Sequence, residues 1–261
     1  MLIFTTDKNR LLKHFRKDPV LFAYHIGDLD DFHFPDCLWS TLVSKRAGIN
    51  DVLLTYTGGD TPTVLAFGLS DDFDNLLNEY VPIAPPRFFC HFRKQHRPIF
   101  REFANETPLG THLKMRLDET MFASRRPTRS TGVIRLDHSH EPALRELYSA
   151  AYPGNYFAAR MLQTGKYFGY VENGAIIAVA GVHVVSDRHR IAVLGNIATH
   201  REYRGRGLAT TLTYQLTEEL VSEGKLVCLN VKADNVPAIT CYRKLGFVPV
   251  HEFEEALFKL R

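Results

Sequence analysis

The sequence lacks any hydrophobic run close to the roughly 20 residues that a transmembrane helix needs. Residues 1–15 also carry charges too early for the apolar core of a secretory signal. With 45% apolar and 23% charged residues, the composition is ordinary for a soluble globular protein. We therefore expect a cytoplasmic protein with no membrane association.

A strong excess of charge is missing too, because 32 basic and 29 acidic residues leave a formal net charge of +3. Apart from Arg125, Arg126 and Arg129 the basic residues are scattered, which argues against a nucleic-acid partner. Cysteine is scarce, and the four present have neither disulfide-like nor metal-ligand spacing (Cys37, Cys90, Cys228 and Cys241). We expect buried free thiols in a reducing compartment and no metal site.

The order of the expected elements divides the chain into two similar halves. Each half has helices, antiparallel strands, a helix, a strand, a helix and a strand, which indicates an α+β (mixed α/β) fold. Residues 124–131, with three Arg, one Pro and no apolar period, are the expected linker. We predict domains at 1–124 and 131–261. The alternative to a duplicated fold is coincidence among common α+β orders.

The second half has the clearer signals. Asn173-Gly174 lies between strand-like runs at 167–171 and 175–185, and predicts a type I′ hairpin turn. Helices are expected at 139–151, 155–164 and 208–222, the last with Leu at every fourth position. Asn235 and Pro237 predict the start of a further helix, which ends before Gly246. The remaining expected strands lie at 133–136, 190–198, 226–231, 247–250 and 256–260.

A glycine-rich turn, Arg204 to Ala209, stands between the strand at 190–198 and the helix that follows. Unpaired backbone amides and the helix dipole make such a turn a candidate anion site, suited to phosphate. At the corresponding place the first half has Gly68-Leu69-Ser70-Asp71-Asp72, which offers acids and no glycine cradle. We therefore do not expect the first half to bind the same anion.

The second half contains two motifs, the first of which is Arg204-Gly205-Arg206-Gly207-Leu208-Ala209. The second motif follows it in the chain and runs from Asn235 through Tyr242 and Lys244 to Phe247. They resemble Arg/Gln-x-x-Gly-x-Gly/Ala and Asn-x-x-Ala-x-x-x-Tyr-x-Lys-x-Gly-Phe of the GNAT superfamily of acetyl-CoA-dependent N-acetyltransferases. The resemblance covers residues 133–261. It implies a GNAT fold, a mixed and mostly antiparallel twisted sheet flanked by helices, with a degenerate GNAT-like N-terminal half that lacks the cofactor loop.

The resemblance also implies where acetyl-CoA binds. The strand at 190–199 should splay from the strand at 226–231 and admit the pantetheine arm, held by backbone groups of Ile197 and Thr199. An amide near Ile197 or Ala198 would polarise the thioester carbonyl. The other residues implied to bind the cofactor are Arg204, Gly205, Arg206, Gly207, Leu208, Ala209, Thr210, Asn230, Asn235 and Tyr242.

Tyr242 matches the family's general acid, which protonates the leaving thiolate of CoA. A phenol with the ordinary pKa of about 10 is protonated at neutral pH and suits this role. The alternative is a core tyrosine that packs its helix against the sheet. Asn235 has an alternative as well, since an Asn at a helix start is commonly a cap.

The general base is less clear, because the strand at 191–199 has no acid. Asn230 stands where related N-terminal-amine acetyltransferases often have Glu, which weakens an assignment to ribosomal-protein or peptide N-termini. Candidate bases are His183, Glu172 and a water chain held by Asn196 or Asn230. In the region that often lines the acceptor, we expect packing or surface roles for Tyr152, Tyr156 and Arg160.

Together these features predict an N-acetyltransferase that moves the acetyl group of acetyl-CoA to a primary amine. The acceptor would be a small molecule or a peptide, attacked without a covalent enzyme intermediate because no Cys is expected beside a His. A homodimer is a possible assembly. The alternatives are a non-catalytic CoA-binding or sensing module and a transferase for a longer acyl-CoA.

Overall fold

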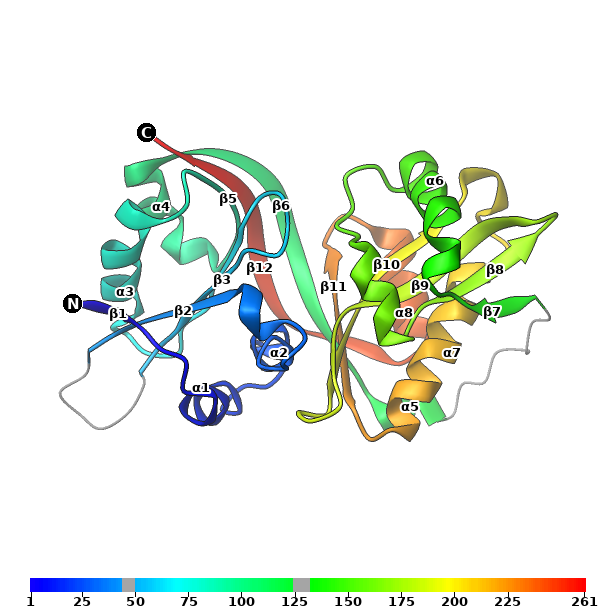
Figure 1. The fold of residues 1–261 in the computed structure, drawn as a ribbon, viewed down its shortest axis with the longest axis horizontal. Helices are drawn as coiled ribbons and strands as arrows, with labels where there is room; N and C mark the ends of the chain where they lie inside the picture. The colour runs from blue at the N-terminus through cyan, green and yellow to red at the C-terminus, as the bar shows by residue number, and fades with distance from the viewer. Residues whose placement is uncertain (44–49, 124–131) are drawn as a thin grey trace. The chain divides into compact units, whose positions relative to one another are not determined.

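The computed structural model describes residues 1–43, 50–123 and 132–261, and the chain forms two compact units. Unit 1 comprises residues 1–114, 232–234 and 250–261, and unit 2 comprises residues 115–231 and 235–249. Two long strands, β6 (Ala104–Leu117) and β12 (Phe247–Leu260), belong partly to each unit (Figure 1). The expected linker at 124–131 lies outside the described residues. Residues 250–261, which the predicted division puts in the second domain, join unit 1.

The sheet of unit 1 is mixed. Its first four strands pair antiparallel with their neighbours in sequence, β4 pairs parallel with β5, and β5 pairs antiparallel with β12. The strands are β1 (Leu2–Phe4), β2 (Cys37–Leu42), β3 (Leu53–Tyr56), β4 (Thr63–Ala66) and β5 (Arg87–Phe92). The register joins Glu254 to Phe92 and Lys259 to Arg87, so the C-terminal end of the chain completes this sheet (Figure 1).

Helices of unit 1 begin and end where local chemistry allows. Asp7 caps α1 by accepting the backbone N–H groups of Asn9 and Arg10, and α3 buries the stripe that starts at Phe73 and ends at Tyr80. The core includes a cluster of rings from α4, β5 and β12. The helices are α1 (Lys8–Phe15), α2 (Ala23–Gly27), α3 (Phe73–Tyr80) and α4 (Arg97–Phe103), with 3-10 turns η1 (Phe34–Asp36), η2 (Val81–Ile83) and η3 (Lys94–His96).

The sheet of unit 2 repeats this pairing pattern. Four strands pair antiparallel in sequence order and the last of them, β10, pairs parallel with β11. The strands are β7 (Val133–Arg135), β8 (Phe168–Glu172), β9 (Ala175–Ser186), β10 (Ile191–Thr199) and β11 (Leu226–Lys232). Between β8 and β9, Asn173 and Gly174 have φ of 52° and 81°, so the predicted type I′ turn is confirmed.

Helix α7 of unit 2 follows the predicted bounds. Leu212, Leu216 and Leu220 are fully buried on one side of it, and each contributes roughly 2 kcal/mol by burial. The helices are α5 (Glu119–Ala123), α6 (Glu141–Ala151), α7 (Leu208–Ser222) and α8 (Val236–Lys244), with 3-10 turns η4 (His138–His140), η5 (Ala159–Thr164) and η6 (Arg201–Tyr203).

Two expectations about elements are wrong. The helix expected at 155–164 is a 3-10 helix over Ala159–Thr164, and residues 155–158 are irregular. The strands expected at 247–250 and 256–260 are one continuous strand, β12. Its middle residues do not alternate strictly between apolar and polar, which is why the sequence suggested an interruption.

All four cysteines are free, and three of them are buried as expected; Cys241 is half-buried. Within the described ranges, no cluster of three or more His, Cys, Asp and Glu side chains could hold a metal ion. In the same part of the chain, no helix is both long enough and apolar enough to cross a membrane.

Candidate active site

The parallel pair of β10 and β11 opens partway along its length. The two strands are in register from Ile191 with Leu226 to Leu194 with Leu229, and the pairing stops there although both strands continue. Beyond Leu194 the edge of β10 that faces β11 is therefore released from the ladder. This opening lies where the sequence places the arm of the cofactor.

At the same point β10 contains a β-bulge. Gly195 pairs with Gly181 of β9 and Ala198 pairs with Val179, so Asn196 and Ile197 together oppose a single residue. Asn196 takes the left-handed conformation, with φ of 55°. Such a bulge leaves backbone groups outside the ladder and re-aims them. The bulge thus supplies backbone donors beside the opening.

The glycine-rich turn presents an open cradle at the start of α7. Gly205 and Gly207 have φ of 79° and 77°, both are exposed, and no heavy atom lies within 4 Å of a Cβ built on either. The residue before the helix is Gly207, so no side chain at this position can accept a hydrogen bond from the amides of the first turn. The amides of Leu208, Ala209 and Thr210 then have no partner within the helix. This geometry suits an anion.

The two arginines of the turn have different surroundings. Arg204 donates from Nε to the carbonyl of Thr199 and from Nη2 to that of Ala151, both at 3.2 Å. Arg206 stacks its guanidinium 4.7 Å from the centre of the Tyr203 ring, and its Nη1 lies 3.8 Å from Glu172 Oε2. Arg204 therefore fixes the turn to the end of β10, whereas Arg206 leaves the end of β10 free and contacts Tyr203 and Glu172 instead.

Two polar atoms near the opening have no partner within the described residues. They are Nδ2 of Asn230, directly after the last paired residue of β11, and Oγ1 of Thr199, at the end of β10; both are buried. A buried polar atom without a hydrogen bond is costly unless a ligand or water satisfies it. The opening therefore fits a ligand that carries hydrogen-bonding groups, as the pantetheine amides of CoA do.

Tyr242 and Asn235 occupy α8. The Tyr242 ring is 8% exposed and packs edge-on against Phe247 at 6.1 Å. Burial raises the pKa of Tyr242 above its ordinary value, and the nearby Cys241 and Tyr152 add to this. The phenol is thus held protonated at neutral pH. Asn235 caps the helix by accepting the N–H of Ala238 at 3.2 Å.

His183 lies on β9, half-buried, against the bulge. Its ring covers the Cα of Gly195, since a Cβ built there would come within 1.9 Å of Cδ2, and it stacks with Tyr156 at 6.5 Å between centroids. Tyr156 and Tyr152 are 40% and 47% exposed. Of the candidate bases, His183 is the one set beside the bulge, whereas Glu172 lies near Arg206.

The Asn196 side chain is only 2% exposed and fully engaged. Its Nδ2 donates to Tyr167 Oη at 2.9 Å, and its Oδ1 accepts from Asn155 Nδ2 at 3.2 Å. This occupancy does not favour the water-holding role considered from the sequence. Tyr167, Asn155 and Tyr148, which donates to the Asn196 carbonyl, went unnoticed there, because their residue types also suit packing and loops.

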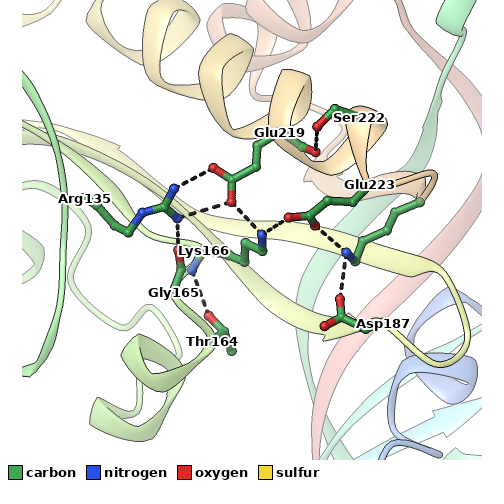
Figure 2. A network of polar contacts seen from close by, with 9 residues as sticks. Arg135, Thr164, Gly165, Lys166, Asp187, Glu219, Ser222 and Glu223 are labelled. Atoms are coloured by element: carbon green, nitrogen blue, oxygen red, sulfur yellow. Dashed lines mark hydrogen bonds and ion pairs between the residues drawn. The ribbon is translucent and has the colours of Figure 1, made fainter.

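The far end of α7 is fixed by a chain of alternating charges (Figure 2). Burial raises the pKa of Glu219, but hydrogen bonds from Arg135 and Lys166 outweigh this and leave the pKa below its ordinary value. The cations also offset two carboxylates at the negative end of the helix dipole. The participants are Arg135, Lys166, Asp187, Glu219, Glu223 and Lys225. The C-terminal end of α7 is thus tied to β7, to the residue stretch before β8 and to the turn after β9.

The corresponding loop of unit 1 holds an anion of its own. Asp51, which is 4% exposed, accepts the backbone N–H of Leu69 at 2.7 Å and that of Ser70 at 3.3 Å, and it also binds the Ser70 hydroxyl. Burial raises the pKa of this carboxyl, and these hydrogen bonds act against that shift. The loop amides that could meet a phosphate are therefore engaged by the chain itself.

Comparison with known proteins finds a family model that matches part of the chain. Residues 133–247 match the model of the acetyltransferase (GNAT) family. The sequence has no match among curated proteins.

Several solved structures resemble the whole chain. A Drosophila protein is 13% identical with a TM-score of 0.74, over 99% of this chain and 98% of that one. A tandem GNAT protein from the clavulanic acid biosynthesis pathway is 15% identical, with a TM-score of 0.63 over 99% and 97%. A GCN5-related N-acetyltransferase from Sphaerobacter thermophilus is 13% identical, with a TM-score of 0.63 over 100% and 96%. The predicted GNAT fold in two halves is confirmed.

Proposed function

We propose that this protein, whose residues 133–247 match the model of the acetyltransferase (GNAT) family, transfers the acetyl group of acetyl-CoA to a primary amine. The observation that carries the proposal is the opening of β10 from β11 after Leu194 and Leu229, next to an exposed glycine turn at a helix start. The turn fits a pyrophosphate, and the orphaned Asn230 amide at the opening fits a polar arm.

In the proposed reaction the acceptor amine attacks the thioester carbonyl directly. Backbone N–H groups of the bulge, at Ile197 or Ala198, stabilise the negative charge that develops on the carbonyl oxygen. The C–S bond then breaks, and Tyr242 donates its proton to the departing thiolate. Positioning by the turn and the strands supplies most of the remaining rate enhancement.

The proton of the attacking amine needs an acceptor, and we assign this role to His183. The strand β10 has no acid, and the imidazole lies directly over Gly195, the residue before the bulge. A neutral imidazole is a competent base near neutral pH. His183→Gln should therefore lower acetyl transfer more at pH 7 than at pH 9, where a larger fraction of the amine is already neutral.

Thiol release from acetyl-CoA, measured with a panel of small primary amines and short peptides, tests the proposal. We expect release that depends on at least one amine and saturates with it. Binding of CoA without amine-dependent release across the panel would favour a sensing module instead. The same assay with propionyl-CoA and longer acyl-CoA decides which acyl group the enzyme prefers.

A further inference from the structure

We propose that Asn196 is a positioning residue, which together with Tyr148 and Tyr167 holds the β10 bulge so that its free N–H groups face the thioester carbonyl. The inference rests on the proposed function, because it explains how the backbone donor of that reaction is kept in place. It gives Asn196 a role different from the catalytic one that the sequence suggested.

The bulge is held at its backbone by α6. Tyr148 donates its hydroxyl hydrogen to the Asn196 carbonyl at 3.0 Å, and the tyrosine is 4% exposed. This hydrogen bond takes a carbonyl that the strand ladder no longer uses at the bulge. With the carbonyl fixed on the α6 side, the peptide plane that joins Asn196 to Ile197 is fixed as well, and with it the direction of the Ile197 N–H.

The bulge is held a second time through the side chain. Asn196 Nδ2 donates to Tyr167 Oη at 2.9 Å, and that hydroxyl donates onward to the carbonyl of Val182 on β9, also at 2.9 Å. The Tyr167 ring cannot shift easily, because it is fully buried and lies over Gly181. The side chain of the bulged residue is thereby tied to the adjacent strand.

Asparagine meets three requirements of this position at once. It tolerates the left-handed φ of 55° better than most residues. Its amide donates to Tyr167 and accepts from Asn155, which a carboxylate could not do in the same arrangement. Its small size fits a position that is 2% exposed.

The third contact links the bulge to the irregular segment that carries exposed Tyr152 and Tyr156. Asn155 lies between these two residues, and its Nδ2 donates to Asn196 Oδ1 at 3.2 Å. A molecule that binds on this segment would therefore act on the same side chain that holds the bulge. The Asn155–Asn196 hydrogen bond therefore connects the segment around Tyr152 and Tyr156 to the bulge whose backbone N–H groups bind the thioester carbonyl.

The preference of the protein for acetyl-CoA over CoA tests the inference without any acceptor, since only acetyl-CoA presents a carbonyl to the bulge. We expect the wild-type chain to bind acetyl-CoA roughly five-fold more tightly, as one well-placed hydrogen bond allows. Asn196→Gly keeps the left-handed backbone and removes the side-chain hydrogen bonds to Tyr167 and Asn155, and Tyr167→Phe removes one hydroxyl. Both should abolish the preference while leaving the affinity for CoA unchanged.

Turnover gives a second measurement. With an active amine, both variants should lower kcat by roughly 100-fold, the scale of a misplaced catalytic group, and change KM for acetyl-CoA little. The double variant should lower kcat no further than either single variant, because both changes remove the same hydrogen bond between Asn196 and Tyr167. Tyr170→Phe, in β8 three residues after Tyr167, is the matched control and should behave as wild type. Folding of each variant is checked by circular dichroism.

Each outcome decides one question. If folded Asn196→Gly keeps the preference for acetyl-CoA and the wild-type kcat, or if the wild type binds both forms equally, the positioning role is overturned. A preference that disappears in the variants supports it. If the wild type shows this preference but no amine-dependent thiol release, the proposed function fails while the role of Asn196 in holding the bulge stands.

Discussion

The imidazole of His183 covers Gly195 on the adjacent strand so closely that a Cβ on Gly195 would lie 1.9 Å from Cδ2 and 2.2 Å from Nε2. The space for the ring therefore exists only because residue 195 has no side chain. This contact places the proposed base against the bulge that carries the proposed backbone donor.

Gly195→Ala should displace the His183 ring and lower acetyl transfer by at least about 10-fold, while CoA affinity stays close to wild type. We also expect a loss of about 1–3 kcal/mol in the free energy of unfolding, because the interior becomes overpacked. Steady-state kinetics and urea denaturation measure the two effects. The double variant Gly195→Ala/His183→Ala restores space, so its stability should exceed that of the single variant; equal stabilities would contradict the contact.

Gly207→Glu should abolish CoA binding measured by calorimetry. The carboxylate would occupy the cradle at the start of α7 and repel the pyrophosphate, and the left-handed φ of 77° adds a backbone cost of about 1–2 kcal/mol. Gly224→Glu is the matched control, because Gly224 has φ of 71° and equally open surroundings after the other end of α7. Unchanged CoA affinity in folded Gly207→Glu would refute the assignment of the cradle.

Tyr242→Phe should lower kcat by roughly 10²-fold and leave the CoA dissociation constant nearly unchanged, as expected for loss of a general acid. Burial raises the pKa of the Tyr242 phenol, so the wild-type residue stays protonated across the neutral range. The hydroxyl makes no hydrogen bond to any described residue, and its removal should therefore cost little stability. An equal loss in CoA affinity would point to a packing role.

Asp51→Ala should destabilise unit 1 by about 1–3 kcal/mol, since it leaves the N–H groups of Leu69 and Ser70 without their acceptor. Asp51→Asn keeps an acceptor oxygen and should cost less. Neither change should alter CoA affinity, because the proposed cofactor residues lie in unit 2. Chemical denaturation and calorimetry on the same samples test both statements, and a change in CoA affinity would contradict the second.

Acidification should destabilise the protein from about pH 6.5 downward, before carboxylates titrate. Burial, with a contribution from Lys114, lowers the pKa of fully buried His25 well below its ordinary value. Below pH 6.5 the unfolded chain therefore binds a proton that the folded chain does not, and stability falls by up to about 1.4 kcal/mol per pH unit. Denaturation between pH 7.5 and 5 measures the slope. In His25→Phe this part of the slope should be absent, and an unchanged slope would rule out His25 as its source.

The sequence by itself determined the features whose physical cause is local. Glycine and asparagine accept positive φ most readily, so these residue types predict the hairpin at Asn173-Gly174 and the turn at Gly205–Gly207. The spacing of Leu212, Leu216 and Leu220 predicts helix α7, because it puts the three side chains on one face that can pack against a core. These local signals, joined to the second motif, were sufficient to indicate the GNAT fold.

Only the tertiary structure decided features that depend on residues distant in sequence. Residues 250–261 complete the sheet of unit 1 by pairing with β5, which lies more than half the chain away in sequence. The sequence could not predict this pairing, because the choice of a distant partner strand leaves no local pattern. The hydrogen bonds that hold Asn196 likewise come from Tyr148 in α6 and from Tyr167, the residue directly before β8. A tyrosine hydroxyl can reach many acceptors, so the choice among them is made by the packing of the whole unit.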